Sequence, residues 1–192
     1  ATRDAEQTSG AVVNYDQVAH PGVLRIPADA GDLWAALNDT RNSLFRNLPT
    51  NWTSLRLKLL FAPTQNYQQA GIAVYQNDDN YVYVTRINNW GNKVICSREV
   101  GGSATIVGSV SETTTNLHLR LDRDAATGTI SASYSLNGTN WVTLGSATQT
   151  LNNPRLGIVV GASPGGFPNA DLAWVEITAP QSNPILAVSP GN

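Results

Sequence analysis

The sequence predicts an all-β protein, a two-sheet antiparallel jelly-roll sandwich in a single domain. Short segments that alternate apolar and polar residues recur along the 192-residue chain. Turn-forming Gly, Pro, Asn and Asp residues separate these segments. Only residues 32–38 have helical spacing, and they amount to one short turn. We expect the sandwich to span residues 1–180, and the Pro-, Ser- and Asn-rich residues 181–192 to form a linker-like tail.

The expected strands follow one another at short intervals. Pro21-Gly22 gives a turn signal before the first strand, and Asn137-Gly138 is a strong hairpin dipeptide. Residues 116–123 alternate strictly, with Leu117, Leu119 and Leu121 on one face. In order, the strands are expected at residues 23–26, 42–46, 52–61, 67–75, 81–87, 93–99, 105–110, 116–123, 129–135, 141–144, 155–161 and 171–178.

The most informative element is the hairpin of residues 67–87, whose turn is a run of Asn and Asp. Its two strands present one aliphatic face and one polar and aromatic face. The aliphatic face carries Ala70, Ile72, Val74, Val82 and Val84, and the other carries Gln69, Gly71, Tyr75, Tyr81, Tyr83 and Thr85. Tyrosines and amides beside a glycine suit the flat faces and hydroxyl groups of a sugar.

Composition excludes several classes of function. The chain is 41% hydrophobic and 14% charged, with a net charge of −2. It therefore lacks the basic surface that nucleic acid or an anionic membrane requires, and no apolar run approaches the ~18 residues of a membrane span. The single cysteine, Cys96, cannot form an internal disulfide, and its strand-like setting indicates a small buried residue. We expect a monomer.

Several motifs together resemble a known family. They are Leu24-Arg25-Ile26, Gly31-Asp32-Leu33-Trp34, Tyr67-Gln68-Gln69-Ala70-Gly71, Asp79-Asn80-Tyr81-Val82, Leu119-Arg120-Leu121, the run from Tyr134 to Trp141, and Ala170-Asp171-Leu172-Ala173-Trp174. In this order, over residues 23–178, the chain resembles the concanavalin A-like modules of secreted bacterial proteins. It is similar to the C-terminal accessory module of bacterial β-xylosidases and to laminin-G-like modules of carbohydrate-active enzymes.

The resemblance implies a secreted, extracellular protein that is one domain of a larger polypeptide, with a concave and a convex sheet. It also implies a structural calcium ion near the last strand, with Asp171 as a ligand. Oxygen ligands of this kind suit calcium. The chain departs from the family pattern at Ala173, where an aspartate is usual, and a possible ligand is lost there.

We do not expect an enzyme. Glucanases of this fold place acid and base carboxylates on one strand so that both flank the glycosidic bond. Asp122 and Asp124 have the right spacing, but they adjoin a turn, and the adjacent Asp78 and Asp79 point to opposite faces of any strand. No nucleophile elbow, phosphate loop or histidine-rich metal motif is present in the sequence.

The residues expected to bind carbohydrate are Gln69, Tyr75, Tyr81, Tyr83, Trp90, Arg98 and Arg120. The first four form the outward row of the hairpin, with Trp90 in an amide-rich turn at its edge. Each has an alternative: a register slip of one residue would bury the tyrosines, and Trp90 would equally serve as a lid on the core. For either arginine taken alone, a cross-strand ion pair with Glu99 or Asp122 is favoured over sugar binding. Trp141 and Trp174 are expected to pack in or beside the core.

Two functions follow from this pattern. The first is a non-catalytic carbohydrate-binding module that holds a polysaccharide or other glycan on one sheet face. The second is a structural spacer that supports neighbouring domains of the same polypeptide and has no glycan affinity. The first requires exposed aromatic side chains on a sheet face, and the second requires filled sheet faces.

Overall fold

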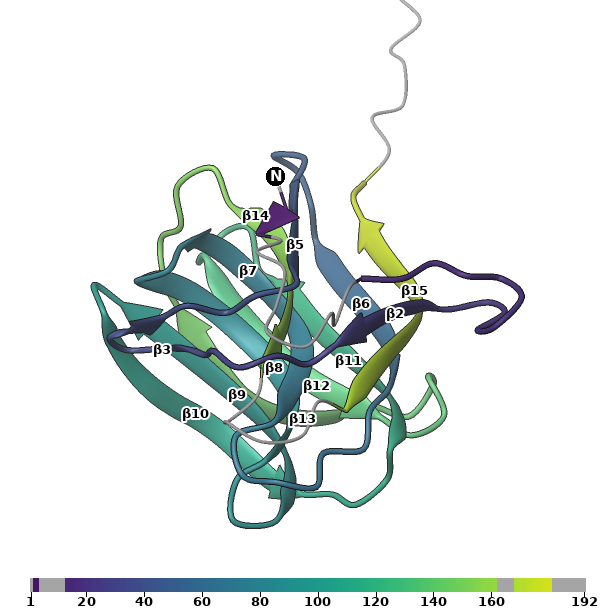
Figure 1. The fold of residues 1–192 in the computed structure, drawn as a ribbon. Helices are drawn as coiled ribbons and strands as arrows, with labels where there is room; N and C mark the ends of the chain where they lie inside the picture. The colour runs from purple at the N-terminus through teal and green to yellow at the C-terminus, as the bar shows by residue number, and fades with distance from the viewer. Residues whose placement is uncertain (1, 4–12, 162–167, 181–192) are drawn as a thin grey trace, which may run out of the picture.

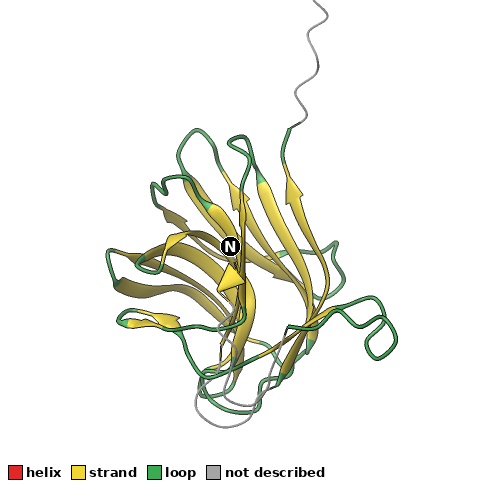
Figure 2. Ribbon diagram, turned by 45° about the horizontal axis from the view of Figure 1, so that its top comes forward, coloured by secondary structure: helices red, strands yellow, loops and turns green. Residues whose placement is uncertain are grey.

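The computed structural model describes residues 2–3, 13–161 and 168–180, and every regular element in these ranges is a β-strand (Figure 2). No segment in these ranges is a helix that could span a membrane. Two large antiparallel sheets pack face to face (Figure 1), which confirms the predicted sandwich. The expected tail, residues 181–192, lies outside the described residues, as do residues 162–167.

We call the seven-stranded sheet sheet A and the six-stranded sheet sheet B. Sheet A has the order β1-β5-β14-β7-β8-β9-β10, and sheet B the order β13-β12-β11-β6-β15-β2. The strands of sheet A are β1 (Thr2–Arg3), β5 (Ser43–Asn47), β7 (Gln69–Asn77), β8 (Asn80–Asn88), β9 (Asn92–Val100), β10 (Ser103–Ser111) and β14 (Arg155–Gly161). Those of sheet B are β2 (Leu24–Pro27), β6 (Ser54–Leu60), β11 (Asn116–Arg123), β12 (Thr129–Ser135), β13 (Val142–Thr148) and β15 (Asn169–Thr178).

The main core lies between the sheets and follows the alternation of the sequence. Sheet B supplies the leucine rows of β6 and β11, which pair in register from Leu55 opposite Leu121 to Leu59 opposite Leu117. Sheet A supplies the aliphatic face of the β7–β8 hairpin and Cys96, all fully buried or nearly so. Burial raises the pKa of the Cys96 thiol to about 12, so this residue is an inert core side chain, as expected.

The two sheets meet along one flank, where the edge strands β10 and β13 come into contact. Gly108 makes this possible, because a Cβ atom there would lie 2.0 Å from the carbonyl oxygen of Leu144. A register shift in β10 between Ile106 and Gly108 accompanies the approach. The sandwich is thus nearly closed on this side.

Residues 28–42 form a cover on the outer face of sheet A, and we call them the covering segment. The sequence pattern predicted a helical turn here, and that prediction is wrong. The segment contains a small two-stranded ladder, β3 (Leu33–Trp34) with β4 (Leu37–Asn38), turned by Ala35 at a φ of 53°. The backbone N–H groups of Asp39 and Thr40 both donate to the carbonyl of Asp32, which closes the hairpin. Seven residues with helical spacing are too few to outweigh these bonds.

Candidate functional site

The tyrosine row lies on the face of sheet A that points away from the main core. Tyr81 and Tyr83 stack on each other at 5.1 Å between ring centroids and belong to a second cluster outside the inter-sheet core. Val82 and Val84 point inward between them, so the register expected from the sequence is confirmed. The residue alternation was therefore sufficient to assign the two faces of this hairpin.

The row is nevertheless closed to a ligand. Tyr75, Tyr81 and Tyr83 are exposed by 3%, 0% and 1%, and Gln69 by 2%. Leu33 of the covering segment packs into the tyrosine cluster, with Trp34 beside it. The expectation of an open aromatic groove is wrong in this structure, because a segment 30 to 50 residues earlier in the chain fills it.

A hydrogen-bond network fixes the covering segment to the sheet. The Tyr81 hydroxyl lies between the carbonyl of Leu33 and Oε2 of Glu99, the latter at 2.8 Å. The same Glu99 oxygen accepts the backbone N–H of Ala35 at 2.8 Å, and Gln69 Nε2 donates to Asp32 Oδ1 at 2.5 Å. Because Glu99 is fully buried, these bonds form in a low-dielectric setting where each counts for more than at the surface.

Electrostatics under the covering segment favour neutral groups. Burial raises the pKa of Asp32 to about 6, with further increases from the nearby carboxylates of Asp39 and Glu99. Burial likewise raises the pKa of Tyr81 and of Tyr83 above the usual range, so both hydroxyls stay protonated. Four buried oxygens here lack a hydrogen-bond partner among the described residues: Gln69 Oε1, Thr85 Oγ1, Ser97 Oγ and Glu99 Oε1.

The network also brings together two carboxylates that the sequence does not pair, Asp32 and Glu99. They come from the covering segment and from β9, 67 positions apart, and no local motif could have linked them. A glycosidase needs its acid and base on either side of a reachable glycosidic bond. Glu99 has no exposed surface, so the pair has no access to a substrate in this structure.

The other expected residues do not gather at this face. Arg98 lies opposite Val82 in the β8–β9 ladder, so it shares the inward face, and its expected outward position is wrong. Arg120 lies outward, but on sheet B, and it pairs with Asp122 at 2.7 Å. Trp90 is 77% exposed at the β8–β9 turn, where its backbone N–H donates to Asn66 Oδ1. The seven residues therefore occupy at least three separate places.

The outer face of sheet B carries a cluster of aromatic and basic side chains without a covering segment. We call it the tryptophan patch and define it as Arg56, Lys58, His118, Arg120, Trp141, Trp174 and Glu176. Cross-strand pairing sets its rows: Trp174, Lys58 and His118 are neighbours across β15, β6 and β11, and Glu176, Arg56 and Arg120 form the next row. Trp174 is 39% exposed, the largest open aromatic surface of this face.

Contacts within the patch hold its rings in place. His118 lies between the two indoles, with ring centroids 5.6 Å from Trp174 and 6.4 Å from Trp141. The Arg120 guanidinium covers one face of Trp141 at 4.2 Å from the ring centroid, a cation–π contact of about 0.5–1 kcal/mol. Burial and the nearby Lys58 lower the pKa of His118, so the ring is neutral at pH 7.

Sequence reasoning placed Trp141 and Trp174 in or beside the core, and the structure places both on this outer face. The cause at Trp174 is a register shift in β15 between Leu172 and Trp174. Simple alternation from the inward Leu172 would point Trp174 into the core, but the bulge turns it outward and Val175 inward. The outward positions of His118 and Arg120 were correctly predicted from the leucine alternation of β11.

Asp171 was the expected calcium ligand, and its surroundings do not fit a cation. Both of its carboxylate oxygens accept from Arg25, at 2.7 Å from Nε and 2.6 Å from Nη2. A guanidinium thus occupies the position a metal would need. Nor do the described ranges contain a group of three or more His, Cys, Asp or Glu side chains that could hold a metal ion.

Comparison with known proteins places the fold among glycoside hydrolase structures. A GH43 protein of Bacillus licheniformis, BlXynB, superposes with a TM-score of 0.74 at 22% identity, over 86% of this chain and 34% of that one. A xylan β-1,4-xylosidase of Bacillus halodurans C-125 gives 0.70 at 15% identity, over 92% and 38%. A functionally unknown protein of Saccharomyces cerevisiae gives 0.66 at 14% identity, over 92% and 95%.

The chain spans about a third of the length of the two bacterial enzymes. A search of curated protein sequences finds no match. The model of one family, the β-xylosidase C-terminal concanavalin A-like domain, matches residues 12–167, which is most of the sandwich. The chain therefore belongs to the family of concanavalin A-like domains found at the C-terminus of β-xylosidases.

Proposed function

We propose that this chain is a non-catalytic accessory domain of a secreted glycoside hydrolase, and that it binds polysaccharide on the tryptophan patch. The family supports an accessory role, since its members are C-terminal domains of β-xylosidases. The observation that carries the binding proposal is the Trp174 side chain, which is 39% exposed on an uncovered sheet face with charged and polar groups around it.

The chemistry of the patch suits a neutral glycan chain. A sugar ring laid on the Trp174 indole buries apolar C–H surface worth about 1–2 kcal/mol. Lys58 and Arg56 offer donors in the adjoining strand, and Glu176 offers acceptors. Hydrogen bonds of about 1 kcal/mol net each would then orient the sugar. A flat sheet face leaves room for a chain that is longer than one ring, which a closed pocket does not.

A spacer role is the second candidate, and a specific observation favours it. The chain matches only about a third of each bacterial enzyme, so in those proteins the same fold is one part of a longer polypeptide. The tryptophan patch would then face a neighbouring domain of the same polypeptide rather than a glycan. The two roles differ in one measurable property, which is glycan affinity of the isolated domain.

The experiment is calorimetric titration of the domain with soluble xylan, the substrate class in the name of one relative, beside a glycan array. Trp174→Ala should lower the association constant about tenfold, by the stacking term above. Trp90→Ala is the matched variant, because it removes an exposed indole from another surface. A loss with Trp90→Ala alone would move the site to the β8–β9 turn, and no glycan binding at all would support the spacer.

A further inference from the structure

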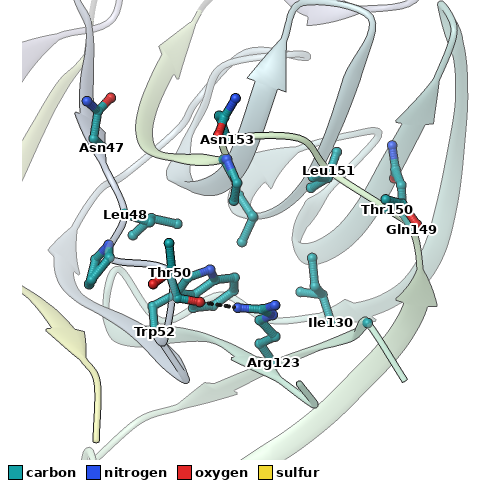
Figure 3. Close-up of a pocket in the computed structure, with 14 residues that line it drawn as sticks. Asn47, Leu48, Thr50, Trp52, Arg123, Ile130, Gln149, Thr150, Leu151 and Asn153 are labelled. Atoms are coloured by element: carbon teal, nitrogen blue, oxygen red, sulfur yellow. Dashed lines mark hydrogen bonds between the residues drawn. The ribbon is translucent and has the colours of Figure 1, made fainter. Parts of the chain in front are cut away.

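A cavity of about 590 Å³ opens at one end of the sandwich (Figure 3), and none of its lining residues belongs to the tryptophan patch. Two loops and the end of one strand form much of its wall. They are the β5–β6 loop with Leu48 and Thr50, the β13–β14 loop with Gln149 and Leu151, and the end of β11 with Arg123. Its size falls within the roughly 300–1,000 Å³ of small-molecule sites. Figure 3 shows these side chains surrounding one common space.

Two buried polar atoms of the cavity lack a partner. Trp52 is exposed by only 2%, and its indole Nε1–H donates to no described residue. Gln149 Oε1 likewise accepts no hydrogen bond, while its Nε2 is fixed by donation to the carbonyl of Glu99 at 2.7 Å. Buried polar groups are rarely left unpaired. Neither atom has accessible surface of its own, so both lie behind the surface that a ligand reaches, and the cavity wall stays polar at these two points.

The charge of the cavity selects the ligand further. Arg123 is the one charged residue among those that line it. Its Nη1 donates to the carbonyl of Thr50 at 3.0 Å, and its guanidinium lies over the Trp52 ring at 5.5 Å. No described carboxylate pairs with Arg123: Asp122 is bound to Arg120, and Asp124 caps the backbone of Ala126. An arginine with free donors favours a carboxylate.

The remaining walls suit a sugar ring. Leu48, Val74, Ile130 and Leu151 give apolar surface, and Asn47, Asn153 and two threonines give hydrogen-bonding groups. We infer that this cavity binds a single sugar unit that carries a carboxylate, a hexuronic acid, at a site separate from the tryptophan patch. The carboxylate meets Arg123, the ring packs on the apolar wall, and the hydroxyl groups pair with the exposed side chains of Asn47 and Asn153.

The test is an NMR titration of the domain with D-glucuronate and, as the neutral match, with D-glucose. Glucuronate should shift the Trp52 indole N–H signal, assigned by its absence in Trp52→Phe, and should bind about tenfold more tightly than glucose. Arg123→Gln should make the two affinities equal. Lys93→Gln removes the same charge at the far end of β9 and should keep the preference.

Several results would overturn the inference. Equal affinity for the two sugars, no binding of either, or a preference that survives Arg123→Gln would each exclude a carboxylate site. A shift at the Trp174 indole in place of Trp52 would assign the ligand to the tryptophan patch. If Arg123→Gln fails to fold, Asn47→Ala decides, because it removes an exposed hydrogen-bonding group of the cavity and should weaken both sugars while the preference for glucuronate remains.

Discussion

The two outer faces of the sandwich both carry aromatic and polar side chains, but one face is buried and the other is open to solvent. Sheet A carries tyrosines, an amide and carboxylates, and the covering segment buries them almost completely. Sheet B carries two tryptophans, a histidine and three basic side chains, and no described segment covers them. Polar aromatic composition therefore does not decide whether a sheet face is open. Whether it is open depends on a segment distant in sequence that covers one face and not the other.

The difference also predicts which substitutions affect stability. On sheet A the aromatic rings act as a second core, in which the Tyr81 hydroxyl bonds to Leu33 and Glu99. On sheet B the rings contact one another and Arg120, while Trp174 keeps more than a third of its surface in solvent. Substitutions on the two faces should thus affect different measurements, and that difference can be tested directly.

The largest effect is expected from Tyr81→Ala on the covered face. It removes a fully buried ring and the hydroxyl that joins Leu33 to Glu99, so unfolding free energy should fall by about 3–5 kcal/mol. Urea denaturation measures it. Tyr81→Phe keeps the ring and should cost about 1–3 kcal/mol, because Glu99 Oε2 loses the hydroxyl and keeps only the Ala35 N–H. A loss below 1 kcal/mol for the alanine variant would mean that the covering segment is loosely held.

A pH-dependent effect comes next, through Asp32. Because its pKa is raised to about 6 in the folded state, the folded protein holds this proton while the unfolded chain releases it near the usual value. The contribution of Asp32 to stability therefore falls as pH rises from about 4 to about 6, by on the order of 1–3 kcal/mol. Asp32→Asn should gain stability relative to the parent over that window.

Melting temperatures of the parent and of Asp32→Asn at about pH 4.5, 6.0 and 7.5 measure this change in stability. Asp124→Asn is the control, because backbone N–H groups of Ala126 and Thr127 hold the pKa of Asp124 below its usual value. Its carboxylate stabilises the fold by a constant amount above the unfolded-state pKa and loses this contribution only at lower pH, so the difference between parent and Asp124→Asn should stay the same at these three pH values. A constant difference between parent and Asp32→Asn would contradict the burial of this carboxyl group.

A small effect is expected from Trp174→Ala on the open face. The side chain already contacts solvent over 39% of its surface, so unfolding free energy should change by less than about 1 kcal/mol. The same urea titration as for Tyr81→Ala compares the two faces under one condition. If Trp174→Ala destabilises as much as Tyr81→Ala, the patch is a structural cluster and the binding proposal loses its main support.

The smallest effect is expected from calcium. Since Arg25 occupies both oxygens of Asp171, neither EDTA nor millimolar calcium should change the melting temperature measurably. Arg25→Gln frees the carboxylate and tests whether the pair excludes a metal. A calcium-dependent rise in the melting temperature of the parent would restore the family's cation site, either at Asp171 or in the residues that the structure does not describe.

The sequence was sufficient to predict the sandwich, because apolar and polar residues alternate along its strands and turn-forming residues separate them. The twelve strands expected from 23–26 to 171–178 are all present, with ends shifted by a few residues. Periodicity failed at residues 32–38, where a short apolar pattern is compatible with either a helical turn or a hairpin. The bonds from Asp39 and Thr40 to the Asp32 carbonyl, which decide the case, join backbone groups and leave no trace in residue pattern.

The candidate site was harder to predict for a physical reason. Alternation correctly gave the face of Tyr81 and Tyr83, but burial of that face depends on a segment that is distant in sequence. Trp174 was misplaced because a bulge inserts one residue, and a bulge is invisible to a period-2 pattern. The end cavity draws on seven separate loops and strands, so no local motif could indicate it.

The contact between β10 and β13, which Gly108 allows, has a consequence for solubility. Unpaired edge strands are where sheets of different molecules join, and domains of this type need a way to prevent it. Here the free edge of sheet A lies against the free edge of sheet B, so each protects the other from a passing strand. A Cβ atom at Gly108 would force the edges apart and expose two templates for aggregation at once.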